Sequence, residues 1–195
     1  SLTNIDKRFS GVEAAAQYTI RPGLTLQAAG SVGQYIYTSR PIATVTQDND
    51  GSVLQEDITV YARNFYLGDT PQRAYTAGLS YQSKQFWTLY LNVNRFEGHF
   101  LSINPLRRTI RSVDVVEYES EQWNEIIHQE ELDGAWTVDV SFYKTFKVDW
   151  PEDGAILSFN LSATNLLNNT DYINNGYEQY RFDFEDHDVS SFPSR

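Results

Sequence analysis

The sequence contains no cysteine, and its basic residues are few and scattered. Without cysteine the chain has no disulfides, no thiolate metal sites and no cysteine nucleophile, and it gives only a weak indication of an oxidising compartment. Its 15 basic residues are outnumbered by 26 acidic ones, for a net charge of -11. Nucleic-acid binding needs basic clusters that displace counterions from phosphates, so this charge argues against a nucleic-acid partner and leaves cationic partners open.

Long hydrophobic runs are also absent. No apolar segment approaches the ~18 residues that a helix needs to cross a bilayer, and the mean hydropathy is -0.48. This excludes a helical membrane protein but not a transmembrane β-barrel, whose alternating strands have a low average hydropathy. The G-x-S-x-G, P-loop and H-E-x-x-H motifs are missing, so we expect neither an enzyme nor a cofactor. The first residues contain no signal peptide and no initiator methionine, which favours a mature or excised chain.

What the sequence does contain is alternation. From Val12 to Ile20, apolar residues occupy every second position and mostly polar or small residues lie between them, which indicates a strand with two unlike faces. Five further segments repeat this pattern, and tight turns at 21–23, 83–85 and 149–154 join them in pairs. The six predicted strands lie near residues 9–20, 24–37, 73–82, 86–97, 134–148 and 155–165. Each has about the length that a tilted strand needs to cross a bilayer.

The connections between these strands are unequal. Long segments at 38–72, 98–133 and 166–195 alternate with the tight turns, and they carry 19 acidic and 7 basic residues. Outer-membrane barrels have short periplasmic turns and long external loops, whereas a soluble β-sandwich has short loops at both ends. We therefore predict an all-β fold, a partial antiparallel transmembrane β-barrel within a single domain. Because known barrels have about eight or more strands, the six belong to a larger barrel. A soluble β-sandwich adhesin stays as the alternative.

Side chains at the two ends and on the polar faces of the strands fit this prediction. Aromatic girdles are expected at both membrane interfaces. Aromatic residues beside the tight turns are Tyr18, Tyr81, Phe86, Trp87 and Trp150, and those near the long segments are Tyr35, Tyr37, Phe96 and Trp136. The polar positions predicted to line a lumen are Gln17, Tyr90, Asn92, Asn94, Asp139 and Asn160.

One segment resembles a known family. Residues 163–172 (ATNLLNNTDY) resemble the NLL or NLF segment near the C-terminus of TonB-dependent outer-membrane receptors. Further stretches resemble that family in the same order: 64–72 (NFYLGDTPQ), 104–109 (NPLRRT), 129–134 (QEELDG) and 176–179 (GYEQ). The resemblance covers nearly the whole chain, which looks like part of the C-terminal third of such a barrel.

The resemblance implies a function as well as a fold. Such receptors are barrels of about 22 strands with a plugged lumen, and they import a scarce siderophore, glycan or peptide with energy supplied through TonB. The implied location is the bacterial outer membrane. The implied partners are its lipid and lipopolysaccharide, the plug domain, the TonB complex and the nutrient. The family's plug, TonB-contacting segment and closing strand with a terminal aromatic residue have no counterpart in these 195 residues. A passive porin, which needs no plug or TonB, is the second alternative.

The best candidate for substrate capture is a set of aromatic and amide side chains in the long segments. Flat rings beside amides can stack on and hydrogen-bond to a sugar, a peptide or a chelate. The set comprises Tyr61, Asn64, Phe65, Tyr66, Tyr172, Asn174, Asn175, Tyr177, Gln179 and Tyr180. The alternative is that these side chains pack the long segments against one another.

Three charged motifs have both a binding and a structural interpretation. Glu117, Glu121, Glu125 and His128 have helical spacing and offer a weak metal site, or else a solvated loop helix. The run 48–51 (DNDG) resembles the start of a calcium loop, but a hairpin turn explains it more simply. Arg107 and Arg108 offer a clamp for an anion, or else part of a turn after Pro105. The acidity of the long segments disfavours strongly anionic substrates and fits divalent-cation bridging to lipopolysaccharide.

Overall fold

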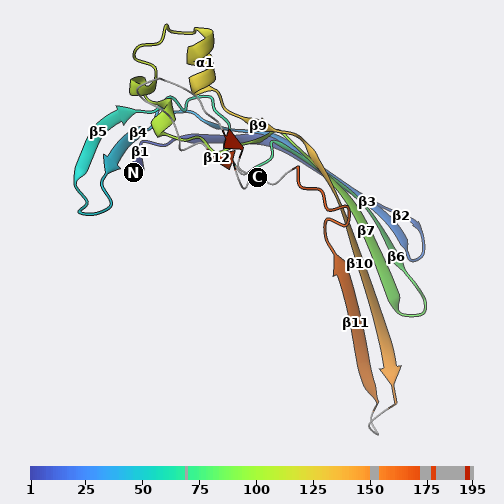
Figure 1. Cartoon of the computed structure of the whole chain (residues 1–195). Coiled ribbons are helices and arrows are strands. Elements are labelled where there is room, and N and C mark those ends of the chain that lie inside the picture. The colour runs from blue at the N-terminus through green and yellow to red at the C-terminus, as the bar shows by residue number, and fades with distance from the viewer. Residues whose placement is uncertain (69, 150–153, 172–176, 179–191, 194–195) are drawn as a thin grey trace.

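Six long strands form one antiparallel sheet in a computed structural model, which describes residues 1–68, 70–149, 154–171, 177–178 and 192–193 (Figure 1). The order across the sheet is β11-β10-β7-β6-β3-β2, so every strand lies beside its neighbours in the sequence of long strands. The strands are β2 (Lys7–Arg21), β3 (Leu24–Tyr37), β6 (Arg73–Gln82), β7 (Trp87–Glu97), β10 (Ala135–Val148) and β11 (Ala155–Ala163). The prediction of an all-β antiparallel fold is confirmed, and the six strands coincide closely with the predicted segments.

The register of the sheet separates apolar from polar side chains over its whole width. One lateral row crosses all six strands through Tyr18, Leu26, Leu79, Leu91, Val140 and Ala163. The next row, one residue along each strand, runs through Thr19, Thr25, Ser80, Tyr90, Ser141 and Ser162. Because successive side chains point to opposite faces, the first row belongs to an apolar face and the second to a polar face.

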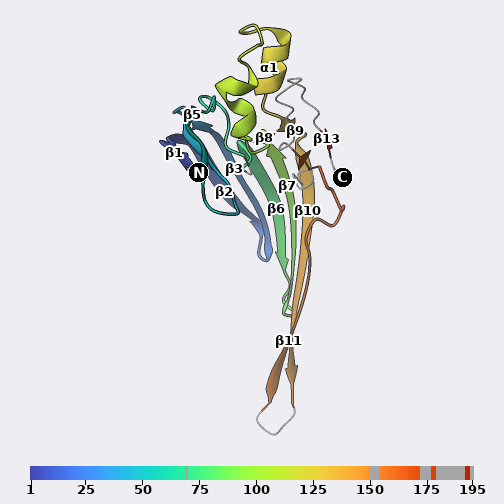
Figure 2. The same cartoon turned by 60° about the vertical axis from the view of Figure 1, so that its left-hand side comes forward.

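The hairpins of the sheet are staggered in one direction. Leu24, beside the first tight turn, pairs with Tyr81, and Trp87, beside the second turn, pairs with Lys144, after which β10 continues to Val148. Each successive hairpin therefore reaches further from the long segments, and β10 and β11 reach furthest (Figure 2). A stagger in one direction is also found among the tilted strands of barrels.

The long segments contain secondary structure that the alternation pattern did not predict. Residues 38–72 include the hairpin of β4 (Ile42–Thr46) and β5 (Val53–Thr59), and β1 (Leu2–Thr3) pairs with β4. Residues 98–133 include β8 (His99–Phe100) paired with β9 (Glu131–Leu132), the 3-10 turns η1 (Leu106–Arg108) and η2 (Ile110–Ser112), and helix α1 (Glu121–Ile127). In the last segment β12 (Tyr177–Glu178) pairs with β13 (Phe192–Pro193). Among the described residues, no helix is long and apolar enough to span a membrane.

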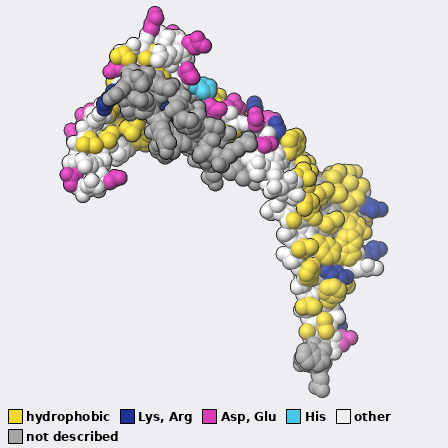
Figure 3. Space-filling model, viewed as in Figure 1, with side chains coloured by type: hydrophobic (Ala, Val, Ile, Leu, Met, Phe, Trp, Pro, Cys, Tyr) yellow, Lys and Arg dark blue, Asp and Glu magenta, His cyan; other side chains and the backbone are white. Residues whose placement is uncertain are grey.

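Among the described residues, buried hydrophobic side chains gather at the end of the sheet where the long segments lie. One hydrophobic cluster joins Ala43, Val60 and Ala62, and another joins Val113, Ile126 and Ile127. By contrast, Tyr18, Leu26 and Leu91 on the apolar face keep 68%, 44% and 37% of their surface exposed. Figure 3 shows hydrophobic side chains gathered over the far part of the sheet, while acidic side chains surround the end with α1. The two hydrophobic clusters of the described residues therefore lie in the connections, whereas most of the apolar face of the main sheet is uncovered.

The register agrees with the predicted aromatic girdle near the tight turns but not with the one near the long segments. Tyr18, Tyr81 and Trp87 lie on the apolar face near the tight turns, and the rings of Tyr81 and Trp87 are 5.1 Å apart. Of the four aromatic residues predicted at the other end, Trp136 shares that face, whereas Tyr35, Tyr37 and Phe96 stand at alternate positions that point to the polar face. Phe86 lies in a turn with a positive φ of 59°, and Trp150 is outside the described residues.

Candidate functional site

The six polar residues predicted to line a lumen share one face of the sheet. Asn92 pairs with Asp139, Asn94 with Thr137, and Tyr90 with Ser141, while Gln17 and Asn160 occupy the same face on β2 and β11. A polar row runs through Gln17, Gln27, Gly78, Asn92 and Asp139. The strands thus present amide, hydroxyl and carboxylate groups together, as predicted from the alternation.

Gly78 leaves room for a hydrogen bond between side chains of two strands that are not neighbours in the sheet. The Gln27 Nε2 atom donates to Asn92 Oδ1 at 3.2 Å, across β6, which lies between their strands. A Cβ atom at Gly78 would lie only 2.3 Å from Asn92 Oδ1 and 2.7 Å from Gln27 Nε2. A glycine inside a strand often marks such a close approach.

Asp139 ties the segment after β11 to the polar face. Its Oδ2 atom accepts from Asn94 Nδ2 at 2.9 Å, and its Oδ1 atom accepts from the backbone N–H of Asn165 at 2.8 Å. Asn165 has a positive φ of 49° and its side chain bonds to the backbone of Asn169 in both directions. The NLLN stretch therefore begins with an asparagine turn fixed to β10.

The described aromatic candidates for substrate capture pack within the long segments. Tyr61 and Phe65 lie half-buried against the cluster of Val113, Ile126 and Ile127. The ring of Tyr66 stacks on Phe100, with centroids 4.1 Å apart. All three rings therefore follow the alternative interpretation, in which they pack the long segments against one another.

The remaining amide and aromatic candidates divide into two groups. Asn64 is exposed, adopts a positive φ of 69° and donates its backbone N–H to the Tyr37 carbonyl, so it forms a turn. Candidates in the last segment lie outside the residues whose side chains are described: Tyr172, Asn174, Asn175, Tyr177, Gln179 and Tyr180. Their arrangement relative to Asn64 stays a prediction.

Arg107 and Arg108 bind the end of helix α1 and do not form an open clamp. Arg107 donates to the carbonyls of Glu125 at 2.9 Å and Ile126 at 2.8 Å, and Arg108 donates to the carbonyl of His128. Cations favour a helix C-terminus, where carbonyl groups lack partners within the helix. Burial, and to a smaller extent the positive charge of Arg107, lowers the pKa of Arg108 to about 9. The anion-clamp interpretation is therefore wrong, because both guanidinium groups are buried against protein carbonyls.

The acidic helix does not assemble a metal site. Helix α1 begins after Ser120, whose hydroxyl accepts from the Trp123 N–H at 3.1 Å, and it ends at Ile127. Glu117 precedes the helix, and Glu121, Glu125 and His128 are exposed. Among the described residues, no three His, Asp or Glu side chains lie close enough to share a metal ion. This geometry favours the solvated loop helix.

The run 48–51 forms the connection of the β4–β5 hairpin. The Gly51 N–H donates to the Gln47 carbonyl at 2.9 Å, and Asp50 Oδ1 accepts from the Ser52 N–H at 2.9 Å. Hydrogen bonds from Ser52 lower the pKa of the exposed Asp50 carboxyl. The hairpin-turn interpretation is confirmed for this run.

Two buried glutamines that the pattern did not single out connect the long segments. Gln129 accepts from the Tyr66 N–H at 2.9 Å and donates to the carbonyls of Tyr66 at 2.7 Å and Leu101 at 3.0 Å. Gln72 accepts from the Tyr35 N–H at 2.7 Å. In each case a side-chain amide forms the hydrogen bonds to backbone groups that a neighbouring strand would otherwise form. The only sequence signal was their position within the QEELDG and GDTPQ stretches, which gives no hint of the partner.

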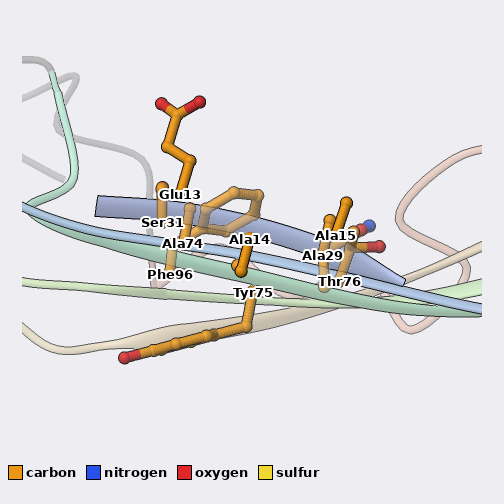
Figure 4. A pocket seen from close by; sticks show the side chains of 11 residues that line it. Glu13, Ala14, Ala15, Ala29, Ser31, Ala74, Tyr75, Thr76 and Phe96 are labelled. Carbon is orange, nitrogen blue, oxygen red and sulfur yellow. The ribbon is translucent and has the colours of Figure 1, made fainter. Parts of the chain in front are cut away.

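A shallow hollow lies where small side chains make the sheet thin. Ala14, Ala15, Ala29, Gly30 and Ala74 line it, and the side chains around it belong to both faces. In Figure 4, Glu13 and Tyr75 point to opposite sides of the strands. The hollow is therefore a thin region of the sheet and offers no enclosed site for a ligand.

Comparisons of the chain with protein-family models, with curated proteins and with solved structures find no match. Its function must be inferred from its own register, exposure and charge.

Proposed function

We propose that the chain is part of an outer-membrane β-barrel that imports a scarce nutrient, of the TonB-dependent receptor type. The observation that carries this proposal is the pair of neighbouring rows that cross all six strands, one apolar and largely exposed, the other polar. A lipid-facing surface needs exposed apolar side chains on one face, and a wet lumen needs polar ones on the other.

The ends of the strands support the same orientation. The ends of β2, β6 and β10 that lead into the tight turns lie at one end of the sheet, and the acidic long segments 38–72 and 98–133 lie at the other (Figures 1 and 3). In an outer-membrane barrel the tight turns would face the periplasm and the long segments the outside. The one-directional stagger supplies the strand tilt that such a barrel requires.

A soluble β-sandwich is less compatible with these features. A sandwich buries the apolar face of each sheet against a second sheet. Here the six long strands belong to one sheet, and the buried hydrophobic clusters of the described residues lie among the long segments. Soluble monomeric proteins rarely expose contiguous apolar patches of more than a few hundred Å².

The receptor is preferred to a porin because of the resemblance in the long segments. In that role, residues of the long segments capture the nutrient, a siderophore, glycan or peptide. Gln17, Asn92, Asp139 and their neighbours on the polar face line the path or contact the plug. The side chains provide binding and orientation only, with no catalytic residue.

Single introduced cysteines test the orientation, and the cysteine-free sequence makes them specific. In cells that produce the full-length protein, Asp50→Cys and Lys84→Cys are treated with a membrane-impermeant maleimide. We expect labelling of Asp50→Cys on intact cells, and of Lys84→Cys only after the outer membrane is permeabilised. Equal labelling of both on intact cells would overturn the proposed orientation.

Uptake separates the receptor from the porin. Cells with and without the gene are grown on limiting iron–siderophore, glycan or peptide, and uptake is measured with and without a protonophore. A receptor predicts that the gene-dependent uptake requires the proton-motive force at low nutrient concentration. Gene-dependent uptake that the protonophore leaves unchanged would support the porin instead.

A further inference from the structure

We infer that Arg73 and Arg95 form a binding site for the phosphate of a lipid headgroup, at the border between the apolar face and the long segments. This inference rests on the proposed membrane location of the apolar face. Arg73 begins β6, and Arg95 lies near the end of β7, so both belong to the end of the sheet that carries the long segments. Their positions in the register place both side chains on the apolar face.

The two guanidinium groups share a single carboxylate. Glu97 Oε2 lies 3.2 Å from Arg73 Nε, and Glu97 Oε1 lies 3.0 Å from Arg95 Nε. Two positive charges against one negative charge leave the cluster with a net positive charge. The side chains of Arg73, Arg95 and Glu97 keep 47%, 24% and 32% of their surface exposed, so the cluster is accessible from the side of the sheet.

Neighbouring residues fix the position of Arg95. Its guanidinium lies 5.1 Å from the centre of the Trp136 ring, which is half exposed on the same face. A Cβ atom at Gly134 would lie 2.6 Å from the Arg95 Nη2 atom, so only glycine leaves room for this position. A guanidinium held by a ring and a carboxylate loses less conformational entropy on binding a phosphate than a free side chain would.

Charge and position together select the ligand. Charged side chains on a lipid-facing surface are costly except at the headgroup level, where tryptophan is also enriched. Arginine binds phosphate through paired N–H groups. The apolar face continues directly from the cluster through Tyr75, Val93 and Val138, which could receive acyl chains beside the headgroup. A phosphate attached to acyl chains therefore fits this place better than free phosphate does.

The test uses the full-length protein in phosphatidylcholine vesicles that contain either bisphosphorylated lipid A or the same lipid without phosphates. Binding is measured through tryptophan fluorescence and the midpoint temperature of unfolding. We expect a higher affinity for the phosphorylated lipid, and a loss of about tenfold or more of that preference in the R73Q/R95Q variant. The K84Q/K147Q variant removes two positive charges near the tight turns and should keep the preference.

A third variant keeps the inference testable if R73Q/R95Q fails to fold. E97Q removes the shared carboxylate and should bind the phosphorylated lipid at least as tightly as the parent. Equal binding of both lipids by the parent protein, or weaker binding by E97Q, would overturn the inference. If millimolar inorganic phosphate competed for the site as well as lipid A does, the ligand would be free phosphate and not the phosphate of a lipid. Failure of the protein to insert would instead defeat the proposed membrane location.

Discussion

At the residue scale, a few small or buried polar side chains determine how the strands and their connections meet. Gly78 is the clearest case, because the hydrogen bond between Gln27 and Asn92 passes over it. Asp139 has a comparable role at the upper end of β10, where it joins Asn94 to Asn165. Both residues act on the polar face, which in the proposed barrel would face the interior.

Gly78→Ala should lower stability although alanine is normally better than glycine in a strand by about 0.5–1 kcal/mol. The new Cβ would displace the Asn92 and Gln27 side chains and break their hydrogen bond, which contributes about 1 kcal/mol. The crowding itself costs about 1–3 kcal/mol more, so we expect a net loss of about 1 kcal/mol or more in urea unfolding of the refolded protein. The control Gln27→Ala removes the same bond without crowding, and the loss in the double variant should be smaller than the sum of the two single losses. If the two single losses simply added in the double variant, the loss in Gly78→Ala would not come from the hydrogen bond between Gln27 and Asn92.

Arg108→Gln should loosen the long segment 98–133 and leave the sheet intact. The change removes a buried charged donor to the carbonyls of His128 and Asn104, and hydrogen bonds of charged groups contribute about 1.5–3 kcal/mol each. Limited proteolysis should then cleave this segment much faster than in the parent. Arg63→Gln, at an exposed arginine, should leave the cleavage rate unchanged. An unchanged rate in Arg108→Gln would contradict the structural role of this residue.

At the scale of elements, the long strands could be predicted, whereas in the long segments local spacing indicated a loop helix near 117–128 and a hairpin turn at 48–51 but not how they pack. Alternation fixes which face each side chain of β3 or β6 occupies, because a shift by one residue would reverse every position. Helix α1 and the β4–β5 hairpin are short, and they depend on contacts far away in the sequence. The aromatic candidates illustrate the consequence, since a sequence shows that Tyr61 and Phe65 are available but not that Ile126 and Ile127 cover them. Nearness to a strand end predicts a girdle position for Tyr35 and Phe96, whereas the register of their strands places both on the polar face.

Gln129 is predicted to hold β8 and β9 beside the segment that contains Tyr66. Gln129→Ala removes three hydrogen bonds and leaves buried backbone groups of Tyr66 and Leu101 without a partner, at about 1–3 kcal/mol for each unsatisfied group. Hydrogen exchange at the Tyr66 amide should become at least tenfold faster, since about 1.4 kcal/mol changes an equilibrium tenfold. Gln129→Glu keeps the acceptor for the Tyr66 N–H and should give a smaller increase. Equal exchange in the parent and in Gln129→Ala would contradict this role.

At the scale of the whole molecule, the distribution of apolar surface is the reverse of that in a soluble domain. The described part of the chain buries its hydrophobic clusters among the connections and exposes the apolar face of its main sheet. The acidic long segments 38–72 and 98–133 lie at one end of the sheet, and Lys84, Lys144 and Lys147 lie near its other end. A bilayer around the sheet would account for all three features together.

The central claim is that the apolar face contacts lipid, and a pair of neighbouring residues on β7 tests it most directly. Leu91→Cys and Tyr90→Cys carry side chains on opposite faces of the same strand. Each is labelled with bimane in the full-length protein in vesicles, and quenching is measured with doxyl-labelled lipid and with aqueous iodide. We predict that doxyl lipid quenches the label at residue 91 strongly and iodide hardly at all, with the reverse order at residue 90. Iodide quenching of residue 91 as strong as that of residue 90, with no effect of doxyl lipid, would contradict the proposed membrane barrel.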